Sequence, residues 1–144
     1  MKQWVLDASV AAKWLLPPKD EPLSAEALHL LDQYAAGDIA LLVPDLFWPE
    51  IGNIVWKSVR AGRIAEATAS KGLDLLAALN IPTVPTGPLL RDAFRIATTF
   101  DRTVYDSLYV ALAVQAGCQL VTADERLANA MGMRLPVVWL GALP

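Results

Sequence analysis

The chain has 144 residues and a mass of 15.6 kDa, which predicts one domain spanning residues 1–144. One cysteine and one histidine exclude a disulfide framework and a Cys/His zinc site, and they argue against Ser-His-Asp or Cys-His hydrolases. Twelve Lys and Arg against fifteen Asp and Glu give a net charge of −3, so a polyanionic partner would need a local basic rim or a bound cation.

The predicted elements alternate between short apolar strands and helices. In chain order they are a strand at 4–6, helices at 9–16 and 22–36, a strand at 39–43, helices at 45–61 and 64–79, a strand at 81–84, helices at 88–99 and 104–116, a strand at 120–122, a helix at 125–131 and a strand at 137–140. Wholly apolar strands separated by helices predict an α/β fold with a mainly parallel sheet covered on both faces.

The chain is apolar for a domain of this size, with 55% hydrophobic and 19% charged residues. A buried interface, in a homodimer or with a partner chain, would account for this surplus. No segment reaches the length of a membrane span, and Asp7 interrupts the first apolar stretch too early for a signal peptide. We therefore expect a cytoplasmic protein with no membrane association.

Acidic residues directly follow two of the predicted strands. Asp7 comes after the strand at 4–6, and Asp124 comes after the strand at 120–122. Ligands of parallel sheets bind beyond the carboxyl ends of the strands, so we expect both side chains at one edge. The alternative is that each aspartate only caps the helix that follows. Ser9 and Thr122 stand beside them as hydrogen-bonding support, or as ordinary helix-capping and strand residues.

Asp106 begins a helix that is apolar nearly all round, which predicts a buried helix and a carboxylate on a buried face. An unpaired buried carboxylate is costly, so it needs a cation, donors or a proton. The alternative is a capping box with Thr103.

Glu50 lies at the border between the polar and apolar faces of the helix at 45–61, for which Asp45 is the expected N-cap. It is either a carboxylate at the lip of a pocket or an ordinary rim acid. Several carboxylates in one pocket would repel one another, and Mg²⁺ or Mn²⁺, which prefer oxygen ligands, would resolve that repulsion.

The acidic positions and their neighbours resemble PIN-domain ribonucleases, specifically VapC-type toxins of toxin–antitoxin pairs. The matching segments are Val5–Ser9, Glu50–Asn53, Tyr105–Ala113 and Leu120–Asp124, in the family's order and over nearly the whole chain. The resemblance implies a PIN-like three-layer α/β/α sandwich. It also implies a catalytic, metal-binding set made of Asp7, Glu50, Asp106 and Asp124.

The implied activity is Mg²⁺-dependent endoribonuclease chemistry, with Mn²⁺ as a substitute, that leaves 5′-phosphate and 3′-hydroxyl ends. The implied partners are an RNA substrate, a cognate antitoxin and a second copy of the chain. The rival interpretation is a non-catalytic PIN-like module that only binds RNA or protein.

Basic side chains are scattered along the chain and would form the rim that contacts flanking phosphates. The candidates are Lys13, Lys57, Arg60, Arg63 and Arg102. The alternative for each is an ordinary solvated surface. Trp14–Pro18, with Leu28, Leu30 and Leu31, is a candidate antitoxin groove, or else plain core packing.

Overall fold

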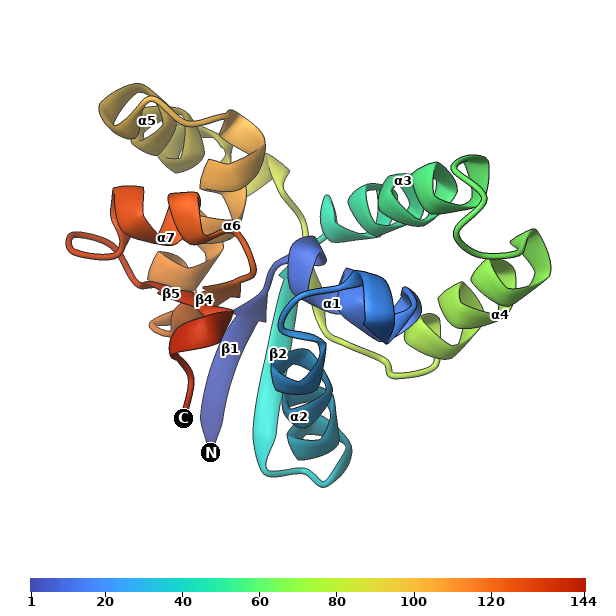
Figure 1. Cartoon of the computed structure of the whole chain (residues 1–144). Helices are drawn as coiled ribbons and strands as arrows, with labels where there is room; N and C mark the ends of the chain where they lie inside the picture. Colours follow the sequence, from blue (N-terminus) through green and yellow to red (C-terminus); the bar gives the residue numbers. More distant parts are fainter.

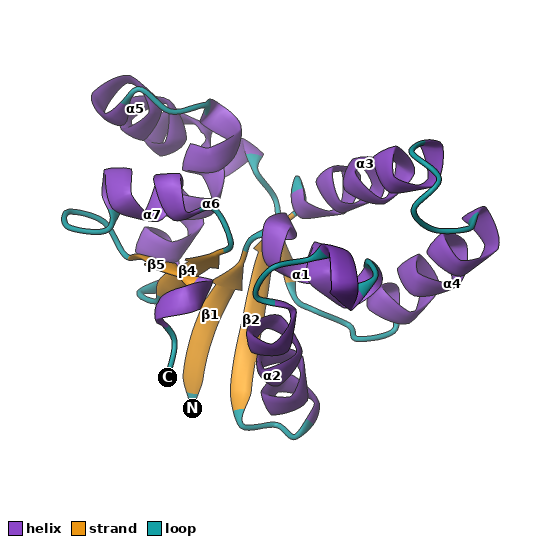
Figure 2. Ribbon diagram, viewed as in Figure 1, coloured by secondary structure: helices purple, strands orange, loops and turns teal.

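A five-stranded, all-parallel sheet forms the centre of the computed structural model, which describes residues 1–144 (Figures 1 and 2). The strand order is β3-β2-β1-β4-β5. The strands are β1 (Lys2–Leu6), β2 (Ile39–Pro44), β3 (Thr83–Val84), β4 (Gln119–Thr122) and β5 (Val137–Trp139). The predicted parallel sheet is therefore confirmed.

Helices cover both faces of the sheet, so the PIN-like three-layer arrangement is confirmed. They are α1 (Ala8–Leu15), α2 (Ser24–Ala35), α3 (Phe47–Arg60), α4 (Glu66–Ala77), α5 (Leu90–Phe100), α6 (Val104–Ala116) and α7 (Glu125–Met131), with short 3₁₀ turns at Pro18–Asp20, Gly87–Leu89 and Leu140–Ala142. In Figure 1, α1 and α2 lie in front of the strands and α6 lies behind them. None of the helices is both long and apolar enough to cross a bilayer.

The core is built from the strands and from α6. Val5, Leu6, Leu120 and Val121 are fully enclosed, as expected for strands covered on both sides. α6 is buried from Ser107 to Ala113 and contacts β1, β2 and β4. This burial fixes the position of the helix that begins with Asp106.

The chain reverses direction across the sheet at β1. It runs outward from β1 to β2 and β3, then crosses back to β4 on the other side of β1. Such a switch point leaves a crevice at the carboxyl ends of the two central strands. Figure 1 shows this end of the strands between α3 and α6, whereas both chain termini lie at the opposite end.

Several helices begin one or two residues away from the predicted start, and the structure shows a cause for two of these differences. The expected N-cap Asp45 lies two residues before α3, which begins at Phe47. The Asp45 N–H bonds instead to the Val84 carbonyl, 2.9 Å away, and so extends the pairing of β2 with β3. α2 begins at Ser24 because Leu23 adopts a left-handed backbone conformation, with φ of 61°.

Candidate metal centre

Asp7 lies at the carboxyl end of the central strand and is held by two hydroxyl groups. Its Oδ2 accepts hydrogen bonds from Ser9 Oγ, at 2.6 Å, and from Thr122 Oγ1, at 2.7 Å. The same two oxygens accept the N–H groups of Ala123 and Asp124, both at 3.0 Å, which leaves the hydroxyl protons for Asp7. The carboxylate makes no capping bond to α1, so capping does not explain its position.

Burial raises the pKa of Asp7 above its ordinary value of 3.8, and the hydroxyl bonds only partly offset that effect. The nearby charge of Asp106 raises the pKa further. Asp7 is therefore a carboxylate with neutral donors and no cationic partner among the side chains, which is a costly arrangement when the group is ionised.

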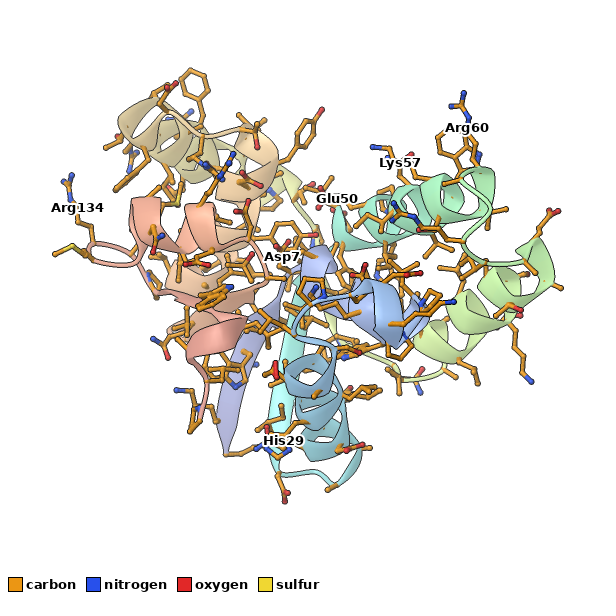
Figure 3. All side chains as sticks on the ribbon, in the orientation of Figure 1. Asp7, His29, Glu50, Lys57, Arg60 and Arg134 are labelled. Atoms are coloured by element: carbon orange, nitrogen blue, oxygen red, sulfur yellow. The ribbon has the colours of Figure 1, made fainter.

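Glu50 reaches the same edge from the first turn of α3 (Figure 3). Its Oε1 accepts a 2.6 Å hydrogen bond from the hydroxyl of Tyr109, a buried residue on α6. Burial raises the pKa of Glu50, the Tyr109 bond lowers it, and the charges of Asp7 and Asp106 raise it. The three carboxylates thus act on one another across the crevice.

Asp106 and Asp124 share one cation. Arg102 Nη2 lies 3.5 Å from Asp106 Oδ2 and 3.3 Å from Asp124 Oδ2. Burial raises the pKa of Asp106, Arg102 lowers it, and Asp124 raises it. Its carboxyl is about a third exposed (36%), because Asp106 lies in the first turn of α6, just before the buried segment that begins at Ser107.

The capping interactions considered for Asp106 and Asp124 are both present in the structure, but neither uses all the oxygens of the aspartate. Thr103 caps α6 by accepting the N–H of Asp106 at 3.1 Å, and the Asp106 carboxylate stays directed at Arg102. Asp124 caps α7 through Oδ1, which accepts the N–H of Leu127 at 3.2 Å. Its other oxygen, Oδ2, faces Arg102.

The donor set suits a hard cation, although the four carboxylates do not close into a shell. No group of three or more acidic, histidine or cysteine side chains is arranged closely enough to surround an ion. Mg²⁺ needs only one or two direct carboxylates, because it retains several of its waters. Carboxylates that raise one another's pKa at a switch point fit such an ion.

The basic residues predicted to form a rim lie in different environments. Lys13 is buried and pairs with Glu21, whereas Arg102 is taken up by the two aspartates described above. Arg60 lies over the Trp56 ring, 5.5 Å from its centroid. Lys57 and Arg63 are exposed and line a hollow that also contains Asp124.

The sequence pattern predicted no role for Tyr109, and it placed Arg102 in the basic rim rather than between Asp106 and Asp124. A signal for Tyr109 was present, since it follows Asp106 by three residues and so lies on nearly the same side of the helix. For the candidate antitoxin groove, Leu16 and Leu30 belong to the core, and Trp14 Nε1 donates to the Ala27 carbonyl at 2.7 Å. These three residues pack α1 against α2, whereas Leu28 of the same candidate groove is 39% exposed, so an antitoxin groove there stays a prediction.

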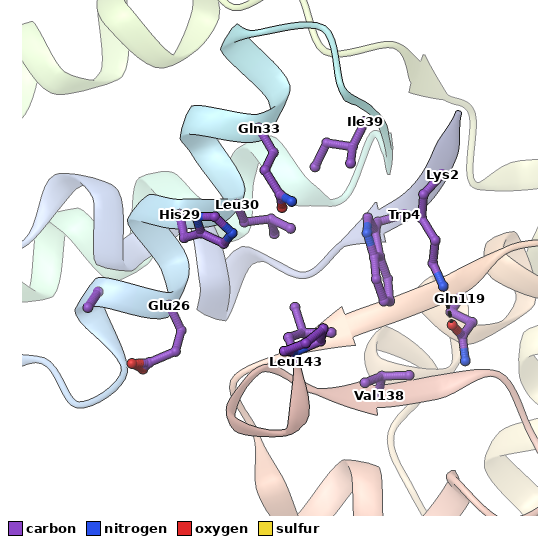
Figure 4. Close-up of a pocket in the computed structure, with 12 residues that line it drawn as sticks. Lys2, Trp4, Glu26, His29, Leu30, Gln33, Ile39, Gln119, Val138 and Leu143 are labelled. Atoms are coloured by element: carbon purple, nitrogen blue, oxygen red, sulfur yellow. Dashed lines mark hydrogen bonds between the residues drawn. The ribbon is translucent and has the colours of Figure 1, made fainter.

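Another cavity lies away from the four acids, at the amino ends of the strands (Figure 4). It has a volume of about 610 Å³, and His29 and Gln33 of α2 face Trp4 of β1 across it. Lys2 Nζ donates to Gln119 Oε1 at its edge, at 3.0 Å. None of the four predicted acids lines this cavity, so we place the candidate site at the other end of the sheet.

Comparison with known proteins places the chain in a family. A family model for the PIN domain matches residues 4–132, and the chain belongs to the PIN domain family. Its relatives include Ribonuclease VapC3 of Pyrobaculum aerophilum, which is 33% identical over 129 residues, or 87% of this chain and 92% of that protein.

Solved structures agree with the fold. The crystal structure of PAE2754 from Pyrobaculum aerophilum superposes with a TM-score of 0.72 at 25% identity, over 97% of this chain and 85% of that one. The VapBC2 complex of Rickettsia felis, bound to a DNA fragment from its promoter, contains a chain that matches with a TM-score of 0.66 at 14% identity, over 95% of this chain and 98% of that one.

Because the acids repel one another, we expect the stability of the protein to depend on pH. The raised pKa values mean that the folded chain binds protons more tightly than the unfolded chain, whose ordinary values are 3.8 for Asp and 4.5 for Glu. The stability contributed by these groups is therefore present below those values and is lost as pH rises through the raised ones. In EDTA, we expect the melting temperature of wild type to fall more steeply than that of Asp7→Asn as pH rises above the ordinary aspartate pKa of 3.8.

Thermal melts of both proteins across that range test the prediction, and added Mg²⁺ should narrow the difference by binding the folded state. Groups other than Asp7 titrate in both proteins, so the difference between the two curves isolates the site. Parallel curves would contradict mutual repulsion.

The Tyr109–Glu50 bond makes a second prediction. Tyr109→Phe should cost about 1 kcal/mol in free energy of unfolding, because a buried acceptor loses its donor. It should also raise the pKa of Glu50 further, because the lost bond favours the ionised form. Urea denaturation and a carboxyl ¹³C NMR titration measure the two effects. Tyr105→Phe is the matched control, since Tyr105 is 61% exposed on the same helix; equal effects from both variants would refute the assignment.

Proposed function

We propose that this chain is a Mg²⁺-dependent endoribonuclease that hydrolyses RNA phosphodiester bonds and serves as the toxin of a toxin–antitoxin pair. The observation that carries the proposal is the set of mutually repelling carboxylates at the switch point of the sheet, with Asp7 at its centre. The ribonuclease name of the 33% identical VapC3 relative supports the same conclusion.

In this proposal, Asp7 and Asp106 hold the ion directly, and Glu50 and Asp124 contribute nearby or through water. Bound Mg²⁺, or Mn²⁺ in its place, supplies positive charge that acidifies a water and stabilises the charge developing on phosphate. The chain is acidic overall, so that positive charge also offsets the repulsion between the site and RNA.

Glu50 is the candidate proton acceptor for the attacking water. Burial and the neighbouring acids raise its pKa toward the range in which a carboxylate accepts a proton effectively. Tyr109 fixes one carboxylate oxygen, which leaves the other for the water. In-line attack on phosphorus then leaves 5′-phosphate and 3′-hydroxyl ends.

A test of this function uses a closed circular RNA, which only an endonuclease can open. We expect wild type to linearise it with Mg²⁺ or Mn²⁺ and not with EDTA. Asp7→Asn should lower the rate at least a hundredfold, because it removes a charged ligand. Gel electrophoresis and end-group analysis of the products measure both results.

Different failures point to different functions. Equal activity in EDTA would reject the metal mechanism, and cleavage of linear RNA alone would indicate an exonuclease. Tight RNA binding with no cleavage under any condition would favour the non-catalytic PIN-like module.

We infer that the chain has protein partners as well. The VapBC2 complex of Rickettsia felis matches in fold and supports an antitoxin as the inhibitory partner. A second copy is expected on α5, where Leu90 and Phe94 are 54% and 61% exposed and lie one turn apart on one face.

The dimer makes a prediction of its own. Phe94→Asp should convert a dimer into a monomer in sedimentation-velocity experiments, because it places a charge inside an apolar contact. Arg91→Glu, on the same helix and also exposed, should leave the dimer intact. A wild-type protein that sediments as a monomer at all concentrations would rule the dimer out.

A further inference from the structure

A second hollow opens directly from the candidate site. It has a volume of about 420 Å³ and lies between α1 and α3, which pack against each other. At one end it is lined by Ser9, which bonds to Asp7, and by Asp124. At the other end it is lined by Lys57, Ser58 and Arg63. A molecule that occupies the site can therefore extend into this hollow without leaving the protein surface.

Lys13 forms part of the wall of this hollow and is unusual for a lysine. It is only 7% exposed, and its single recorded partner is Glu21 Oε1, at 3.4 Å. An ammonium group has three N–H donors, so two of them lack a protein acceptor. Burial of a charged group is costly unless its donors are satisfied, so a buried lysine beside an open hollow is suited to an anion.

The balance of charge in the hollow also favours an anion. Glu21 offsets Lys13, and Arg102, which is shared with Asp106, offsets Asp124 only in part. Lys57 and Arg63 form no ion pair, so they remain as uncompensated cations in the lining. The hollow is therefore positive at the end farther from the acids.

The spacing along α3 relates this hollow to the candidate reaction centre. Glu50 and Lys57 are seven residues apart, which is two helical turns or about 10.5 Å along the axis. Figure 3 shows Glu50 at the end of α3 nearest Asp7 and Lys57 farther along the same helix. A strand whose reacting phosphate lies at the acids would carry a neighbouring phosphate toward Lys57.

We propose that this hollow is a phosphate subsite, in which Lys13, Lys57 and Arg63 bind a backbone phosphate next to the one that is cleaved. The inference rests on the proposed RNA-cleaving function and adds how the substrate is positioned. Ser58, which is buried in the same lining, adds a hydroxyl donor.

The test measures RNA binding separately from cleavage, in an Asp7→Asn background with Mg²⁺. Fluorescence anisotropy of a labelled short single-stranded RNA gives Kd over a range of salt concentrations. We expect Lys57→Ala and Arg63→Ala each to raise Kd about five- to tenfold and to reduce the slope of log K against log salt by about 0.7. Lys71→Ala removes an exposed cation of α4 outside the hollow and should change neither quantity.

The contribution of Lys13 must be tested in a variant that still folds. Lys13→Met alone would leave Glu21 without its partner, so it is combined with Glu21→Gln, which removes both charges together. This double variant should melt within a few degrees of the background protein and lose the same phosphate contact. A thermal melt of each variant confirms that the loss of binding is not a loss of fold.

The outcomes separate this proposal from the proposed function. Unchanged Kd and salt slope in the Lys57 and Arg63 variants would overturn the subsite, and so would an equal loss in Lys71→Ala. Polyglutamate serves as a probe for an acidic protein. If the Lys57 and Arg63 variants bound polyglutamate more weakly but bound RNA as before, the hollow would be a site for an acidic protein and the phosphate subsite would be overturned. Absence of cleavage by the wild-type protein with Mg²⁺ counts instead against the proposed function.

Discussion

Electrostatic repulsion among carboxylates at the carboxyl ends of β1 and β4 is the constraint on which the site depends. Asp7 is half-buried at the carboxyl end of β1, and its only side-chain partners are the neutral hydroxyls of Ser9 and Thr122. Natural proteins retain such costly groups where function requires them. The topology makes the arrangement possible, because the switch point places the ends of two central strands beside each other.

The surrounding residues limit this repulsion without removing it. Arg102 compensates the pair formed by Asp106 and Asp124, and Tyr109 binds Glu50 through a neutral hydroxyl. Asp7 receives no positive charge from the chain. The protein therefore offsets only part of the negative charge in the crevice and leaves Asp7 without a cationic partner.

Much of the fold could be predicted from the sequence, because strands such as Val5–Leu6 and Leu120–Val121 are apolar on both faces and only a covered parallel sheet satisfies them. The positions of Asp7 and Asp124 after their strands followed from that sheet. The start of α3 could not be predicted, because the pairing of Asp45 with Val84 depends on where β3 lies. The roles of Tyr109 and Arg102, and the burial of Lys13, depend on how α1, α3 and α6 pack, and local periodicity carries no information about that packing.

The two ends of the sheet carry different sites, a cavity at the amino ends of the strands and the acidic crevice at their carboxyl ends. This separation affects the search for inhibitors. The roomy cavity around Trp4 and His29 lies at the edge away from the acids and shares no lining residue with them. A small compound bound there would make the protein more heat-resistant by mass action while leaving the acidic crevice open. A screen that ranks compounds only by how much they raise the melting temperature of the protein would thus favour ligands that do not inhibit. Compounds should instead be selected for binding in the acidic crevice.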